Sequence, residues 1–132
     1  MEQNKQAKSG TPGGIRDSLK KATTEMMVLS LLKEKPMYTY EMMAAIEARS
    51  NGVITFNTLY QSIYRLEHHE YIRQHGKLIS EDNRTRIYFV ITEAGKKYLE
   101  QIKLEYLTFT NSVDALLGLD RKEGLPWVTS VI

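Results

Sequence analysis

The chain has 132 residues, of which 42% are hydrophobic and 26% charged, a composition that suits one folded domain with short tails. It contains no cysteine, which excludes disulfides, thiol catalysis and cysteine-ligated zinc or iron–sulfur centres. The formal net charge is only +2, and no apolar run approaches the about 20 residues of a membrane helix, so we expect a cytoplasmic protein.

The first half of the chain is predicted to form a tail followed by three helices. Residues 1–14 are rich in glycine, lack hydrophobic periodicity and are predicted to form a flexible basic tail. Hydrophobic residues at helical spacing predict a first helix from about Ile15, which Pro36 ends. Thr39 can cap a second helix that ends near Arg49, before the stop signal Ser-Asn-Gly. A third helix follows over 57–69.

Two strands and a connecting polar turn are predicted next. Residues 77–79 and 86–91 are rich in β-branched, aliphatic and aromatic side chains, and the segment between them is polar and turn-forming. Residues 53–56 are predicted to form a further short extended segment. The two strands would form a hairpin with an exposed, charged tip.

A last helix is predicted over 92–118, because Thr92 is a good N-cap and Gly118 is a typical stop. Its hydrophobic residues repeat as in a coiled coil, so we expect it to pair with a second copy rather than fold back on its own domain, which is the alternative. The residues expected to form the homodimer, in the first and last helices, are Ile15, Leu19, Leu99, Ile102, Tyr106, Phe109, Val113 and Leu116.

The element order α-α-α-β-β-α predicts a mainly α protein with a small β-wing, a winged helix-turn-helix. Residues 15–91 would form this domain, residues 92–118 the dimerisation helix and residues 119–132 a C-terminal tail. A helix-turn-helix is the kind of motif that places its second helix in the major groove of DNA.

The helix predicted over 57–69 has an apolar stripe on one side and neutral hydrogen-bonding groups on the other. Amide side chains suit the edge of adenine, arginine suits guanine or phosphate, and hydroxyl groups suit phosphate. This polar face is nearly uncharged, so the charge that dominates DNA affinity must come from elsewhere. The face holds Asn57, Gln61, Tyr64 and His68, with Arg65 at its edge and Thr58 and Tyr60 at its start.

Charge is unevenly distributed, because basic residues prevail in 1–22 and 72–97 and acidic residues in 98–132. This asymmetry suits a polyanion bound on one side of the molecule. Lys20 and Lys21 could follow one phosphate strand.

The hairpin has its own basic group. Arg84 and Arg86 lie beside its turn, with Lys77 across, where they could grip backbone or enter the minor groove. The alternative is a solvated hairpin in which Arg86 pairs with Glu81 or Asp82.

Three stretches resemble the PadR-like winged-helix transcription regulators. TLYQSIYRLE resembles their recognition helix, RTRIYFVITEAGKKYL their wing strand and the entry to the dimerisation helix, and MMVLSLLKEKPMYTYEMMAAIE their first two helices. The resemblance covers Ala22 to Leu117. It implies a sequence-specific DNA-binding regulator, a repressor rather than an activator, that binds a pseudo-palindromic operator on double-stranded DNA as a homodimer.

The resemblance also implies DNA contacts by Thr58, Tyr60, Tyr64 and the basic residues of the wing. Glu70 departs from the pattern, because it stands where the family commonly has the glycine that ends the recognition helix. The DNA-binding residues expected from pattern and resemblance together are Thr39, Tyr40, Thr55, Asn57, Thr58, Tyr60, Gln61, Tyr64, Arg65, Lys77, Arg84, Thr85 and Arg86.

The single C-terminal helix resembles the short-chain branch, some members of which bind aromatic compounds at the dimer centre. That branch can carry a tryptophan on this helix, whereas here the aromatic residues are Tyr98, Tyr106 and Phe109. A small-molecule effector at the dimer interface is therefore left open.

No other chemistry is expected. His68, His69 and His75 lack ligand spacing for a metal, GTPGG lacks the ending of a phosphate loop, and no nucleophile–base arrangement is evident. We therefore expect no catalytic site, metal or cofactor. The alternative function is a winged-helix protein-interaction module without DNA binding, which the nearly neutral third helix leaves open.

Overall fold

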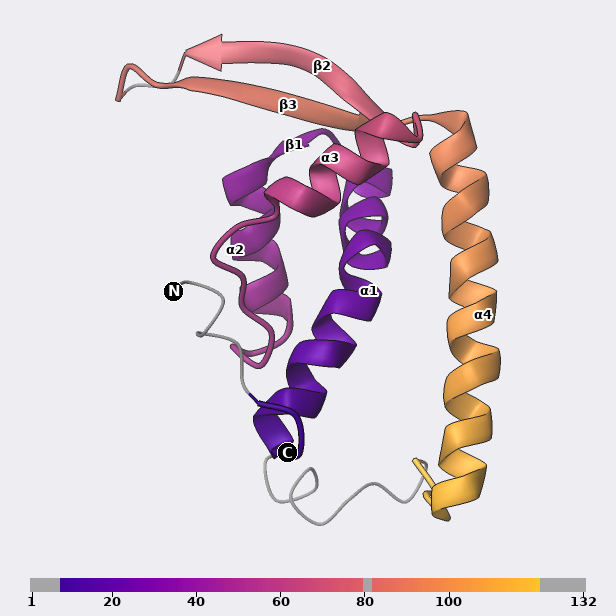
Figure 1. Ribbon diagram of the computed structural model, residues 1–132. Coiled ribbons are helices and arrows are strands. Elements are labelled where there is room, and N and C mark those ends of the chain that lie inside the picture. Colours follow the sequence, from indigo (N-terminus) through magenta and orange to yellow (C-terminus); the bar gives the residue numbers. More distant parts are fainter. Residues whose placement is uncertain (1–7, 80–81, 122–132) are drawn as a thin grey trace. The chain divides into compact units, whose positions relative to one another are not determined.

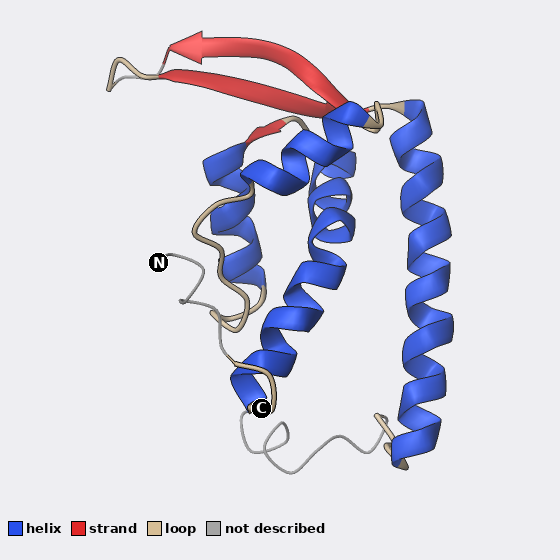
Figure 2. Ribbon diagram, viewed as in Figure 1, coloured by secondary structure: helices blue, strands red, loops and turns tan. Residues whose placement is uncertain are grey.

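The computed structural model describes residues 8–79 and 82–121, and these form helices and one small antiparallel sheet (Figures 1 and 2). The chain divides into two compact units, Met1–Leu99 and Glu100–Ile132. Most of the predicted tails and Glu81 lie outside the described residues. The helices and strands are α1 (Pro12–Glu34), β1 (Met37–Tyr38), α2 (Thr39–Arg49), α3 (Tyr60–His68), β2 (Ile72–Ile79), β3 (Thr85–Ile91) and α4 (Glu93–Leu117).

The predicted winged helix-turn-helix, mainly α with a small wing, is confirmed. The strands pair antiparallel in the order β1-β3-β2, and the hairpin of β2 and β3, here called the wing, lies across one end of α1–α3 (Figure 1). The short strand β1 was not predicted. It pairs Met37 with Phe89 and Tyr38 with Tyr88, a long-range contact that no local pattern reveals.

The first helix begins at Pro12 rather than at Ile15. Thr11 is its N-cap, since the Thr11 hydroxyl accepts a hydrogen bond from the N–H of Gly14 at 3.0 Å. Proline suits the first helical position because its missing N–H would have had no partner there. The two glycines that follow look like tail residues in the sequence, and they hid this start signal.

The second and third helices also begin elsewhere than predicted. Thr39 is the first residue of α2 and not its cap, because Glu41 reaches back to accept the N–H of Tyr38 at 3.1 Å. Asn57 precedes α3, which begins at Tyr60 after a turn in which the Thr58 hydroxyl accepts the Tyr60 N–H at 3.1 Å. Residues 53–56 form no strand.

The wing is longer than the two predicted strands. Strand β2 runs from Ile72, and its register against β3 shifts between Gln74 and Gly76, so that His75 is an extra residue in the strand. Such a bulge bends the strand and increases its twist. It also breaks the alternating pattern, which is why the first half of β2 was not recognised in the sequence.

The predicted apolar stripe of α3 is confirmed as its core-facing side. Leu59, Ile63 and Leu66 are buried, and α3 contacts α1 and strand β2 of the sheet. The other buried hydrophobic side chains of the described residues are Val28, Leu29, Leu31, Leu32, Met37, Met42, Ile46, Ile72, Phe89 and Leu99. Burial of each large aliphatic side chain contributes about 1.5–3 kcal/mol, so this cluster fixes the orientation of α3 in the domain.

The exit of α3 is a tight corner at Glu70, whose φ is 62°. The N–H of Glu70 donates to the carbonyl of Glu67 and the N–H of Tyr71 to that of Leu66, both at 2.9 Å. These two bonds are the Schellman arrangement that normally uses glycine in the left-handed region. The corner therefore has the usual Schellman hydrogen bonds, but Glu70 occupies the left-handed conformation that normally falls to glycine. This conformation costs an L-residue about 1–2 kcal/mol.

Replacing Glu70 by glycine is expected to raise the free energy of unfolding by about 1 kcal/mol, because glycine adopts this φ without strain. Urea unfolding at fixed protein concentration measures the change. Glu70→Ala is the matched control: it removes the side chain but keeps Cβ, so it should bring no such gain. Stabilisation by alanine equal to that by glycine would show that the charge, and not the backbone, matters at this corner.

Candidate nucleic-acid interface

The outer face of α3 presents large side chains to solvent. Tyr60 is 73% exposed and Tyr64 62% exposed, and Gln61 is exposed beside them. Tyr40, at the start of α2, is exposed to a similar degree. Solvated tyrosines on one helix face are uncommon in a core-forming helix, and together with amides they offer hydrogen bonds and flat apolar rings to a partner.

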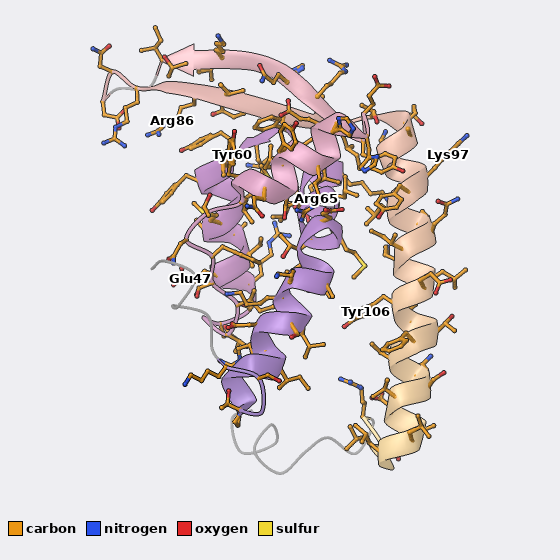
Figure 3. All side chains as sticks on the ribbon, viewed as in Figure 1. Glu47, Tyr60, Arg65, Arg86, Lys97 and Tyr106 are labelled. Carbon is orange, nitrogen blue, oxygen red and sulfur yellow. The ribbon has the colours of Figure 1, made fainter. Side chains whose placement is uncertain are left out.

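An open groove of about 490 Å³ lies between the start of α2, α3 and the wing. Its walls come from three elements that are distant in sequence, and Ile63 and Phe89 lie among its lining residues. Figure 3 shows Tyr60 on the helix side of this region and Arg86 on the wing side. The predicted DNA-binding residues that line this groove, here called the wing groove, are Thr39, Tyr40, Thr58, Tyr60, Tyr64, Thr85 and Arg86.

A second open groove, of about 810 Å³, lies between α1 and the entrance to α3. Lys20 and Lys21 line it from α1, and Asn57, Gln61 and Arg65 from the other side. The lysines lie near the N-terminal end of α3, and Asp17 lines the same groove. We call this the lysine groove.

Lys20 is also a structural residue. Its Nζ donates to the carbonyl of Thr55 at 2.6 Å and lies 4.9 Å from the centre of the Phe56 ring. These contacts tie the loop before α3 to α1. Thr55, predicted to contact DNA, has its carbonyl occupied by this bond.

Arg65 ties α3 to α1 instead of pointing freely outward. Its Nε donates to a carboxylate oxygen of Glu25 at 2.6 Å, and its side chain is 48% exposed. An arginine engaged in this way can still offer other N–H groups, but its direction is set by Glu25. Figure 3 shows Arg65 on the side of α3 that faces α1.

The start of α4 is fastened to the corner after α3. The Thr92 hydroxyl donates to the Glu70 carbonyl at 2.7 Å and accepts the N–H of Gly95 at 3.0 Å, which confirms it as the cap of α4. The rings of Tyr71 and Tyr98 stack with centres 4.2 Å apart. Burial, and then the nearby Glu25 carboxylate, raises the pKa of Tyr98 above its ordinary value.

Comparison with known proteins places this geometry in a family. A family model described as the transcriptional regulator PadR-like family matches residues 28–101. The chain belongs to the PadR-like family of transcriptional regulators. The matched region holds both elements of the helix-turn-helix, the wing and the start of α4. This family consists of regulators of transcription that bind DNA, and not of enzymes.

Individual relatives agree with this membership. A protein of Lysinibacillus sphaericus described only as uncharacterized is 30% identical over 109 residues, covering 80% of this chain and 99% of its own length. A transcriptional regulator from Clostridium thermocellum is 27% identical with a TM-score of 0.67, over 74% of this chain and 96% of that one. A PadR-like regulator from Bacillus cereus shares the fold at 20% identity and a TM-score of 0.64, over 78% and 99% of the two chains.

In this PadR-like regulator, one residue predicted for the dimer seam and one aromatic residue of α4 have roles inside the domain. Leu99, expected in the dimer seam, is 1% exposed and belongs to the core, because the first turns of α4 pack on the domain. Tyr98, one of the aromatic residues that the sequence places on this helix in place of a tryptophan, stacks on Tyr71.

The other predicted dimer residues are accessible to different extents. Ile102 and Val113 are half-buried. The exposed ones are Ile15, Leu19, Tyr106, Phe109 and Leu116, and further exposed leucines on α4 are Leu104, Leu107 and Leu117.

A metal site and a membrane-spanning helix can be looked for only in the part of the chain that the structure describes. Among residues 8–79 and 82–121, no cluster of three or more metal-ligating side chains is found. No helix in this part of the PadR-like chain is both long and apolar enough to cross a membrane.

Sequence reasoning missed two residues that shape the site. Glu25 directs Arg65, and the ring of Tyr38 lies 5.0 Å beneath the guanidinium of Arg86. Both partners are far away in sequence, so no spacing rule could pair them. The one local feature that could have drawn attention to this contact is Tyr38 itself, an aromatic residue directly before the start of α2.

Proposed function

We propose that this chain binds DNA sequence-specifically as a homodimer and represses transcription in the cytoplasm. Helix α3 enters the major groove, and the wing lies on flanking backbone. The observation that carries this proposal is the pair of grooves on either side of the exposed face of α3. All predicted DNA-binding residues except Thr55, Lys77 and Arg84 line one groove or the other.

The two kinds of contact are divided between elements. Gln61 and Tyr64 on α3 supply neutral hydrogen-bonding groups for base edges. Lys21 in the lysine groove, and Lys77 and Arg84 on the exposed wing, supply the positive charge for phosphates that α3 itself lacks.

Pairing of two copies through α1 and α4 gives the homodimer the two-fold symmetry that a pseudo-palindromic operator requires. The exposed apolar side chains of α4 and of Ile15 and Leu19 would be covered in such a dimer. A two-fold axis there presents two α3 helices to one face of the duplex. Half-sites then lie about 34–36 Å apart, or about 10 bp, on a pseudo-palindromic operator. An effector at this interface is open to test by the same binding assays.

Two variants test the division of roles on an operator selected from a random duplex library. Tyr64→Ala is expected to reduce discrimination between the selected operator and a mismatched one by about tenfold. Arg84→Ala should weaken binding to every sequence and lower the slope of log affinity against log salt by about 1, because one phosphate contact is lost. Fluorescence anisotropy over a salt series measures both.

Lys97→Ala is the charge-matched control, since Figure 3 shows Lys97 on α4, pointing away from α3 and the wing. It should bind as the unaltered protein does. Unchanged affinity and discrimination in both test variants would contradict the proposed surface. Absence of any salt-sensitive binding to duplex DNA at low salt would favour the protein-interaction module instead.

A further inference from the structure

The two arginines of the wing lie in different surroundings although they are close in sequence. Both contact Asp82, but the side chain of Arg84 is 74% exposed with its Nε 3.6 Å from the carboxylate, whereas that of Arg86 is only 24% exposed. Nη2 of Arg86 donates to an oxygen of Asp82 at 3.2 Å, and its Nε is buried with no hydrogen-bond partner in the described part of the chain. Figure 3 shows Arg86 on the side of the wing that faces the helices.

Arg86 links the outer part of the wing to its root. Its guanidinium lies 5.0 Å from the ring centre of Tyr38, while its other contact, Asp82, lies in the turn of the hairpin. Tyr38 is fixed in turn, since it pairs with Tyr88 in the sheet and the two rings meet edge to face at 5.3 Å. The chain of contacts therefore runs from the hairpin turn to the residue that precedes α2.

The sheet explains why such a link is needed. The third strand, β1, ends at Tyr38, opposite Tyr88, so beyond this point only β2 and β3 pair. Arg86 pairs with Leu78 in this two-stranded part. A lone two-stranded hairpin is marginally stable and can bend or twist freely. Arg86 and Tyr38 supply, through side chains, the support that the missing third strand does not.

The same contacts make Arg86 a poor phosphate ligand. The Asp82 carboxylate is shared with Arg84, but Arg86 would also have to leave the ring of Tyr38 to reach DNA. An arginine over an aromatic ring is held by electrostatic attraction to the ring face. The Arg86 guanidinium also counteracts the rise in the pKa of Tyr88, which is caused first by burial and then by Glu41.

We propose that Arg86 is a positioning residue that sets the direction of the wing by bridging Tyr38 and Asp82, while Arg84 is the wing's phosphate contact. This rests on the proposed function, in which the wing lies on DNA. Because Arg86 and Thr85 form one wall of the wing groove, the direction of the wing also sets the width of the space beside Tyr60 and Tyr64.

Two measurements separate positioning from contact. In the protein without DNA, Arg86→Ala and Tyr38→Leu are expected to speed amide hydrogen exchange at 77–79 and 85–87 by about tenfold or more, since local opening becomes easier. Arg84→Ala, which removes the same charge from the same hairpin, should leave this exchange unchanged. In DNA binding, Arg86→Ala should lower affinity without changing the salt slope, whereas Arg84→Ala lowers the slope by about 1.

The variants also form a cycle. Since both act through one bridge, the double variant Tyr38→Leu, Arg86→Ala should exchange and bind no worse than the more affected single variant. Arg86→Lys keeps the charge but not the planar group, so it should restore only part of the protection, and it serves if the alanine variant does not fold.

The proposal is overturned if Arg86→Ala leaves hairpin exchange unchanged, or if it lowers the salt slope as Arg84→Ala does. The exchange measurement needs no DNA. A chain that binds no duplex at all would therefore refute the proposed function while the exchange result still decides whether Arg86 holds the wing.

Discussion

Replacement of Gly95 by alanine is expected to lower the free energy of unfolding by about 3 kcal/mol or more, because the added methyl has no room. A Cβ at this position would overlap the carbonyl oxygen of Tyr71 and lie 2.8 Å from Cγ1 of Ile91. The Tyr71 carbonyl cannot withdraw easily, since it accepts the N–H of Thr92 at 3.0 Å. The first turn of α4 would have to move away from the corner that follows α3.

Gly76→Ala is the matched control for this variant. Gly76 lies in β2, and a Cβ there would meet no atom within 4 Å. Alanine at position 76 should therefore be neutral or stabilise by about 0.5 kcal/mol, since it restricts the unfolded chain. Urea unfolding of both variants at one protein concentration makes the comparison. Equal stabilities of the two variants would show that α4 is not seated on Tyr71 as described.

Replacement of Phe109 by aspartate is expected to raise the dissociation constant of the proposed homodimer by at least about 100-fold. Phe109 is 69% exposed in the single chain, and burial of each such side chain is worth about 1.5–3 kcal/mol. Two copies are lost per dimer, and every 1.4 kcal/mol is a factor of ten. A buried carboxylate would add to the loss. Sedimentation equilibrium over a range of concentrations measures the change.

The control for this variant lies on the same helix. Thr108 is exposed and adjacent to Phe109, about 100° around the helix and outside the hydrophobic repeat. Thr108→Asp adds the same charge at the same depth and should leave association unchanged. Equal effects of the two substitutions would mean that charge on α4, rather than the apolar seam, governs association. A chain that is monomeric without substitution would contradict the dimer itself.

The fold could be predicted from the sequence where periodicity and caps agree. The buried stripe of α3 and the limits of α4, capped by Thr92 and closed by Gly118 with φ 72°, follow from local rules. Prediction failed where a structural element depends on contacts between residues that are distant in sequence. Strand β1 exists only because Met37 and Tyr38 meet β3, and the bulge at His75 hid half of β2.

The candidate site shows the same limit. The outward face of α3, with Tyr60 and Tyr64 exposed, follows from helical geometry alone. The sequence could not separate an arginine that faces DNA from one that braces the fold, because Arg65 and Arg86 are directed by Glu25 and Tyr38. The sequence did predict that Arg86 could pair with Glu81 or Asp82, and the structure shows the pair with Asp82.

The boundary of the first compact unit after Leu99 has a consequence for how such a regulator can change. Helix α4 is continuous through this boundary, and its first turns, with Gly95 and Leu99, are embedded in the domain that carries α3. In the proposed dimer, the outer turns of α4 would govern the separation of the two half-sites, and α3 the bases recognised within each. The spacing of the half-sites and the base sequence within each could then evolve separately. Residues beyond Leu99 could be exchanged between relatives without changing which bases α3 recognises.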